Sequence, residues 1–319
     1  APPILLTRAM KRLLWPFILT LFSLILFRVE SNNRQRREML KQAVKGAAIG
    51  ALVSNTQSDV ANLCHALDSL RHLPDSSFES SAHVLVFHDE LSQTQIDYLK
   101  TCTSRFVRFP LVGYSFDTYF PPGFDPNEEI PNWTKRSKWS YQQMIRFWIT
   151  QIWKHEALRE YTTLMRLDSD ACWTVHTMFS RDTMLPTLAH DKFYHANIFK
   201  RDTMCQDIRE FVMNYVKTHN ITPKNPRLYQ QVLEMTDDKC PSFYNNFEIT
   251  RVSFMQQPEI VQWHEAWTEL PPFGVFRNRW GDAVERFMAM ALFATPDMIQ
   301  GKFTHMPRGY QHPCRQALL

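Results

Sequence analysis

The 319-residue sequence is poor in glycine and has none of the glycine-rich motifs that hold phosphates in a loop. Only eight glycines occur, and neither G-x-G-x-x-G nor G-x-x-x-x-G-K-S is present. The sequence therefore supports neither a dinucleotide-binding fold with its usual fingerprint nor a P-loop.

The chain also lacks a strongly basic segment. Its formal net charge is +4, and no long run of lysine and arginine is interleaved with aromatic residues. A charge this small and this scattered gives no sign of a nucleic-acid partner. Hydrophobic residues make up 44% and aromatic residues 13% of the chain, which is typical of a packed core rather than of disorder.

No two of the six cysteines form a C-x-x-C pair, which disfavours a zinc knuckle. An even number of cysteines fits disulfides in an oxidising lumen and equally fits a set of buried free thiols. The sequence leaves both interpretations open. The cysteines are Cys64, Cys102, Cys172, Cys205, Cys240 and Cys314.

No apolar run has the roughly 20 residues that a typical membrane-spanning helix needs. The best candidate, "LLWPFILTLFSLILF" at 13–27, has 15 residues. A thin early-secretory bilayer accepts a shorter span. We therefore predict a signal-anchor helix over 13–28, preceded by a short tail (1–12) and followed by a stem (29–44). A cleaved signal and a buried amphipathic helix are the alternatives.

The orientation of this predicted anchor cannot be read from its flanks, because basic residues stand on both sides. Two N-glycosylation sequons, Asn132-Trp-Thr and Asn220-Ile-Thr, favour a lumenal location for the part that follows. We expect that part, 45–319, to be one catalytic domain.

Strand-like and helix-like segments alternate between 45 and 170. This alternation predicts an α/β fold with a mainly parallel sheet flanked by helices, in which ligands bind beyond the carboxyl ends of the strands. The segment 181–240 is helical in pattern, and we expect it to shape the acceptor side. The predicted strands are 45–55, 82–90, 104–112 and 161–170, and the predicted helices are 59–73, 93–102 and 140–158.

Two aspartates, Asp168 and Asp170, end the fourth predicted strand in "RLDSD". Carboxylates at such a strand end can hold a divalent cation, which in turn neutralises a nucleotide diphosphate. The pattern alone is weak, because aspartates after a strand also serve as helix caps and turn residues.

Three further segments carry candidate groups. Glu248 stands among aromatic and amide residues in "YNNFEI", where it is either partly desolvated or simply a surface residue beside a strand. Asp282 follows Trp-Gly and is suited to cap the helix "AVERFMAMALF". His305 and His312 lie in "HMPRGYQHPC", and either could ligate a metal, although most histidines do not.

Five of these segments, taken in order, resemble motifs of glycosyltransferase family 15, the fungal-type α-1,2-mannosyltransferases. They are "SYQQMIRFW", "RLDSD", "YNNFEI", "RWGDA" and "GYQHP". The resemblance extends from about residue 45 to 314. It implies a GT-A nucleotide-sugar-binding fold, GDP-mannose as donor, a mannose-terminated oligosaccharide or glycoprotein as acceptor, retention of anomeric configuration, and Mn²⁺. It also implies a single-pass type II Golgi membrane protein.

The resemblance carries roles over to particular residues. The family's acidic tripeptide usually begins Glu-Pro, whereas this chain has Asp168-Ser169, and the shorter side chain leaves open which of the two aspartates reaches the metal. The implied roles are metal binding by Asp168, Asp170 and His312, catalysis by Glu248 as the nucleophile and Tyr141, and nucleotide binding by Arg146, Arg166 and Asp282.

Two alternatives remain beside the mannosyltransferase interpretation. The altered Asp168-Ser169 pair is compatible with a non-catalytic sugar-binding relative of the same fold. A glycosyltransferase that uses another nucleotide sugar is the second alternative, and competition between GDP and UDP would separate it.

Overall fold

The computed structural model describes one compact unit of the chain, within Ala43–Leu319. The predicted anchor and stem, the sequon at Asn132 and His305 lie outside the described residues. No helix within those residues is both long and apolar enough to span a membrane. The described ranges are 46–73, 82–116, 118–127, 139–178, 194–196, 199–300 and 308–314.

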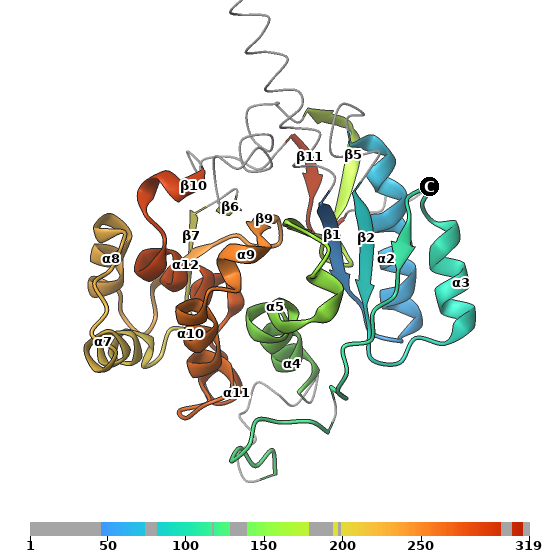
Figure 1. The fold of residues 1–319 in the computed structure, drawn as a ribbon. Helices are drawn as coiled ribbons and strands as arrows, with labels where there is room; N and C mark the ends of the chain where they lie inside the picture. Colours follow the sequence, from blue (N-terminus) through green and yellow to red (C-terminus); the bar gives the residue numbers. More distant parts are fainter. Residues whose placement is uncertain are drawn as a thin grey trace, which may run out of the picture. The chain divides into compact units, whose positions relative to one another are not determined.

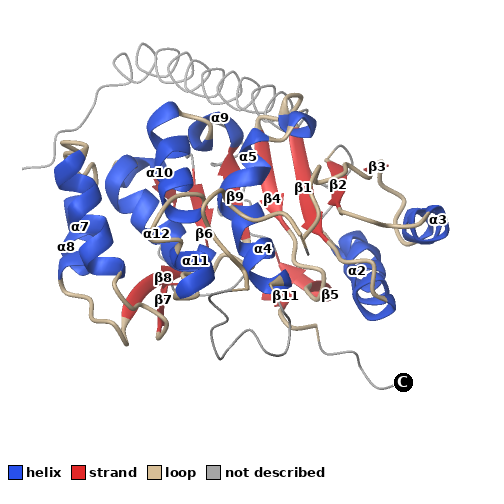
Figure 2. Ribbon diagram, turned by 90° about the horizontal axis from the view of Figure 1, so that it is seen from below, coloured by secondary structure: helices blue, strands red, loops and turns tan. Residues whose placement is uncertain are grey.

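A central sheet with strand order β10-β6-β9-β4-β1-β2-β3 organises this unit (Figures 1 and 2). β1 pairs in parallel with β2 and β4, whereas β9 runs antiparallel to both β4 and β6. The prediction of a mainly parallel α/β sheet is therefore confirmed, with β9 reversed. The strands are β1 (Ala47–Leu52), β2 (His83–Phe87), β3 (Val107–Arg108), β4 (Thr163–Arg166), β6 (Tyr194–Ala196), β9 (Glu248–Arg251) and β10 (Ile299–Gln300).

Each face of the sheet has its own apolar core, because successive strand residues point to opposite faces. Ile49 packs with Leu63 and Leu67 from α2, on the face that α2 and α3 cover. Ala48 belongs to the larger core on the other face, with Trp148. The helices of these two layers are α2 (Gln57–Ser69), α3 (Gln93–Thr101), α4 (Ser140–Arg146) and α5 (Ile152–Lys154), the last two joined by a π-turn (Phe147–Gln151).

The C-terminal half adds a helical layer around α12, which is buried along nearly its whole length. It also adds two small antiparallel sheets, β5 with β11 and β7 with β8. The further elements are β5 (Cys172–Met178), β7 (Phe199–Asp202), α7 (Ile208–Thr218), α8 (Pro226–Leu233), β8 (Cys240–Phe243), α9 (Val252–Met255), α10 (Pro258–Thr268), α11 (Gly274–Arg277), α12 (Asp282–Phe293) and β11 (Arg308–Gln311), with short 3₁₀ turns at Leu70–His72, Glu156–Leu158 and Pro296–Met298.

Two local predictions needed correction. The helical pattern over 181–240 is right for α7 and α8, but β6 and β7 also lie in that segment. The predicted strand 104–112 shrinks to β3, since Pro110 cannot donate a ladder hydrogen bond and only an isolated bridge at Leu111 follows.

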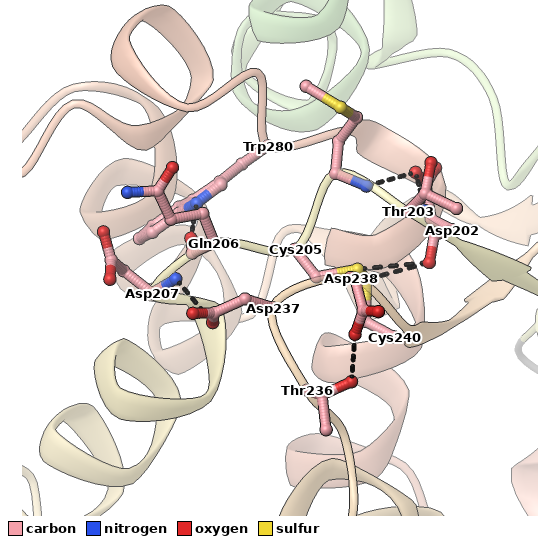
Figure 3. The surroundings of a disulfide bond; sticks show 11 residues. Asp202, Thr203, Cys205, Gln206, Asp207, Thr236, Asp237, Asp238, Cys240 and Trp280 are labelled. Carbon is pink, nitrogen blue, oxygen red and sulfur yellow. Dashed lines mark hydrogen bonds between the residues drawn. A yellow bond between two sulfur atoms is a disulfide. The ribbon is translucent and has the colours of Figure 1, made fainter.

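All six cysteines are paired in disulfides, which decides between the two interpretations that the sequence left open. Cys64–Cys102 ties α2 to the residue that follows α3, and Figure 3 shows Cys205–Cys240 beside the end of β7. The third pair is Cys172–Cys314. Disulfides form and persist in oxidising compartments.

Candidate functional site

A polar pocket of about 500 Å³ opens beyond the carboxyl ends of β1 and β4. Six of the eight predicted site residues line it, namely Tyr141, Arg166, Asp168, Asp170, Asp282 and His312. The sheet thus brings together side chains that are up to 171 residues apart in the sequence, counting from Tyr141 to His312.

Asp168, Asp170 and His312 form a compact triad on one side of the pocket. Nε2 of His312 lies 3.0 Å from Oδ1 of Asp170 and 3.6 Å from Oδ2 of Asp168. One ligand atom from each residue lies within 4.8 Å of the other two. Two carboxylate oxygens and one imidazole nitrogen are donors that a divalent cation accepts, so the residues fit a metal.

Neighbouring side chains orient the triad. The hydroxyl of Tyr244 lies 2.9 Å from Nδ1 of His312, so that Nε2 faces the carboxylates. The amide of Asn246 donates to Asp168 and lies 3.2 Å from Nε2 of His312. Tyr310 in turn donates to the backbone carbonyl of Asn246 at 2.5 Å. Outer partners of this kind fix the direction of metal ligands.

The triad has a negative local field. Burial lowers the pKa of His312, but the hydrogen bond to Asp170 and the charges of both aspartates outweigh it, so the pKa lies above its ordinary value. The hydrogen bond from His312 holds the pKa of Asp170 below its ordinary value. Burial, followed by the charges of Asp168 and Asp170, raises the pKa of Tyr244 to about 12.

Arg166 connects the triad to the opposite wall of the pocket. Its Nε donates to Asp168 at 2.7 Å, and its Nη1 donates to Asp282 at 2.5 Å. The guanidinium group lies 4.5 Å from the ring centroid of Trp148. Although burial disfavours the charged form, the two carboxylates raise the pKa of Arg166 above its ordinary value.

Asp282 is the first residue of α12 rather than its N-cap, which is Gly281. The capping prediction was therefore wrong by one position, and the side chain is free to meet Arg166. Trp280, two residues before Asp282, packs against Gly274: a Cβ atom on Gly274 would lie 2.1 Å from the indole, so only glycine leaves room for that ring. The indole also donates to the carbonyl of Gln206 at 2.8 Å (Figure 3).

Arg146, predicted to contact phosphate, does not line the pocket. It is 1% exposed and donates to both carboxylate oxygens of Glu269, at 2.7 and 2.5 Å. A further bond of 3.1 Å reaches the carbonyl of Tyr119, and the rings of Tyr114 and Tyr119 lie within 5.3 Å. These contacts make Arg146 an anchor for the segment around Tyr114 and Tyr119.

Glu248 lies behind the pocket wall rather than on it. It is 2% exposed, so the surface interpretation was wrong. Nε of Arg286 donates to its carboxylate at 3.1 Å, and Nη2 lies at 3.4 Å. Glu248 is nevertheless close enough to Arg166 for its charge to help raise the pKa of that pocket residue.

The wall opposite the triad contains residues that the sequence did not single out. Arg201 and Asp202 come from the end of β7, while Ser242 and Asn245 come from β8 and the turn after it. Within the described residues neither Arg201 nor Asp202 forms an ion pair. Tyr141 completes this side, with the guanidinium of Arg279 4.9 Å from its ring centroid.

The chain is similar to known mannosyltransferases in sequence and in fold. The family described as "Glycolipid 2-alpha-mannosyltransferase" matches residues 32–316. The glycolipid 2-alpha-mannosyltransferase of Saccharomyces cerevisiae is 25% identical over 184 residues, 54% of this chain and 39% of the relative. The probable mannosyltransferase KTR4 of the same yeast is 22% identical over 280 residues, 80% of this chain and 58% of the relative. The chain thus spans less than two thirds of either relative.

Two solved structures show the same fold. Core-mannan synthase A from Aspergillus fumigatus, in its Mn/GDP form, has a TM-score of 0.64 at 17% identity, covering 80% of this chain and 72% of that chain. The mannosyltransferase Ktr4p from S. cerevisiae in complex with GDP has a TM-score of 0.66 at 22% identity, covering 84% of this chain and 71% of that chain.

Proposed function

The chain belongs to the glycolipid 2-alpha-mannosyltransferase family, and on that premise we propose that it is a retaining α-1,2-mannosyltransferase that moves mannose from GDP-mannose to a mannose hydroxyl on a glycan. The observation that carries this proposal is the triad of Asp168, Asp170 and His312 in the wall of a pocket of about 500 Å³, a volume in the range of small-molecule sites.

We propose that the triad holds Mn²⁺, which the Mn/GDP form of the Aspergillus relative supports. When bound, the ion supplies positive charge for the departing diphosphate. Tyr244 and Asn246 keep Nε2 of His312 directed at the aspartates. Arg166 donates to both Asp168 and Asp282, and it thereby fixes the distance between these two carboxylates across the pocket.

Glu248 is the proposed partner of the oxocarbenium-like centre. A carboxylate can serve there as a covalent nucleophile or as a fixed negative charge. The two contacts from Arg286 and the burial of Glu248 favour the fixed charge, because a nucleophile must reach the anomeric carbon. Tyr141, on the pocket wall, is placed near the reacting groups in this proposal.

The opposite wall is the proposed acceptor side. Asp202, Ser242 and Asn245 offer hydrogen-bond acceptors and donors suited to sugar hydroxyls. This wall comes from β7, β8 and the turn after β8, in part from the segment that the sequence associated with the acceptor. We further propose a type II Golgi location with the 13–28 segment as anchor, which the complete pairing of the cysteines supports.

A transfer assay tests the proposal. The full chain is incubated with GDP-mannose, methyl α-mannoside and Mn²⁺, and the product is analysed by NMR. The expected product is an α-1,2-linked dimannoside. Glu248→Gln should lower turnover by orders of magnitude while GDP affinity stays nearly unchanged. GDP binding without product would instead indicate a non-catalytic relative, and turnover of a UDP-sugar would indicate a different donor.

A further inference from the structure

The three disulfides differ in how they relate to the pocket. Cys172 stands two residues after Asp170, and Cys314 stands two residues after His312. This bond therefore joins the segment that carries Asp168 and Asp170 to the segment that carries His312. Its cysteines are separated by 142 positions in the sequence, so no local turn could bring the segments together.

In the described part of the chain, the segment that carries His312 is otherwise held by non-covalent contacts alone, which include those of Tyr244 and Asn246 with the imidazole. β11 pairs with β5 through Tyr310 opposite Trp173 and Gln311 opposite Cys172. The ring centroids of Tyr310 and Trp173 are 4.9 Å apart. Beyond β11, the backbone N–H of Cys314 donates to the carbonyl of Asp170 at 2.6 Å.

We infer that the Cys172–Cys314 disulfide is a positioning element of the metal site, which holds His312 within ligating distance of Asp170. The inference rests on the proposed function, because it takes the triad as the site of a divalent cation. The two cysteines act through His312 and Asp170, and neither of them is a ligand itself.

The disulfide acts on the fraction of molecules in which His312 is docked beside Asp170 and can therefore bind a metal. A short strand that is held only by non-covalent contacts, as β11 would be without the disulfide, can detach locally without unfolding of the domain. A metal that needs His312 then binds only to the docked fraction, and its apparent dissociation constant rises in inverse proportion to that fraction. A covalent bond beside the ligand keeps the docked fraction near one.

Cys64–Cys102 provides a matched control. Like Cys172–Cys314, it joins one buried cysteine to one half-buried cysteine. It ties α2 to the end of α3, and none of its residues lines the pocket. Its removal can lower stability, but it leaves the segment of His312 as it was.

The test compares Cys172→Ser/Cys314→Ser with Cys64→Ser/Cys102→Ser and the wild-type full chain. Mn²⁺ alone is titrated, and the free ion is measured by electron paramagnetic resonance, with circular dichroism as the check on folding. We expect the first variant to bind Mn²⁺ about 10- to 100-fold more weakly, the range seen when outer partners of metal ligands are lost. The control variant should bind as the wild type does.

Saturating Mn²⁺ separates positioning from general damage. In the first variant it should restore the wild-type kcat for mannosyl transfer, because the bound metal itself recruits His312. Equal Mn²⁺ affinity in wild type and Cys172→Ser/Cys314→Ser would overturn the inference alone. A wild-type protein that binds no Mn²⁺ would overturn the metal assignment, and the inference with it.

If the double variant does not fold, the folded wild type is titrated with reductant while mass spectrometry follows which pair opens. Mn²⁺ affinity should fall in step with opening of Cys172–Cys314 and not with opening of Cys64–Cys102. A loss that follows the control pair, or no loss when Cys172–Cys314 is open, would contradict the inference.

Discussion

Two clusters in this protein have similar chemistry and opposite surroundings. In the open cluster, Asp168 and Asp170 face His312, and in the buried cluster, Glu248 and Glu285 face Arg286. In the open cluster, the side chains of His312, Asp168 and Asp170 are 20%, 15% and 46% exposed. In the buried cluster, Arg286 and Glu285 are fully buried. Only the open cluster lines the pocket, so only that cluster can accept a new ligand.

The difference lies in how far the carboxylates are already satisfied. The N–H groups of Arg286 donate hydrogen bonds to Glu248, to Glu285 and to the carbonyl of Trp148. Glu285 also accepts from the indole of Trp263 at 2.8 Å. In the open cluster, Arg166 and Asn246 donate to Asp168, whereas Asp170 is 46% exposed and, among the described residues, faces only Nε2 of His312, so it keeps carboxylate lone pairs for a cation. Saturation fixes a charge in place, whereas spare acceptors at a pocket make a binding site.

The largest expected effect comes from breaking the buried cluster. Arg286→Met leaves two carboxylates buried without a counter-charge, and loss of one partner of a buried pair costs about 3–5 kcal/mol. Denaturant unfolding should show this loss. Adding Glu248→Gln and Glu285→Gln to the same chain should recover most of it. A single variant as stable as the wild type would show that the cluster is solvated.

Removing a carboxylate from the open cluster should have a smaller and different effect. Asp170→Asn deletes a proposed ligand charge, and we expect Mn²⁺ affinity to fall about 100-fold, or about 2.7 kcal/mol. Unfolding free energy should change little, because the side chain is nearly half exposed. Asp89→Asn, two residues beyond the end of β2 and outside the pocket lining, is the matched control. Equal losses in both variants would place the metal elsewhere.

The buried cluster should also respond to pH. Burial raises the pKa of Glu285 to about 7, above its ordinary 4.5, although Arg286 opposes the shift. The folded state therefore binds more protons between these values, so this group's stabilising contribution is complete below pH 4.5 and is lost as pH rises to 7. Glu285→Gln should flatten the fall in unfolding free energy between pH 5 and 8 by about 2–3 kcal/mol. An unchanged slope would contradict the raised pKa.

The smallest effect belongs to a fully solvated pair. Arg71 and Asp68 are 65% and 43% exposed, with 2.8 Å between Nη1 and Oδ1. Exposed pairs contribute about 0–1 kcal/mol, so Arg71→Ala should shift the unfolding midpoint very little. A destabilisation as large as that of Arg286→Met would mean that burial does not separate these clusters.

The sequence predicted the first half of the sheet because long apolar and amphipathic segments alternate there. It could not predict β5, β7 or β11, whose short strands depend on pairing with distant partners. Arg146 and Arg166 illustrate the limit. Both stand in the motifs of the family, yet only the folded chain brings Glu269, 123 positions away, against Arg146 and removes it from the pocket. The disulfide partners were beyond prediction for the same reason.

The most direct test of the central claim is a calorimetric titration of GDP into the folded full chain, with Mn²⁺ and with EDTA. The proposed site predicts GDP binding that requires Mn²⁺ and is much weaker for UDP. Absence of GDP binding in both conditions would contradict a donor site at Asp168, Asp170 and His312.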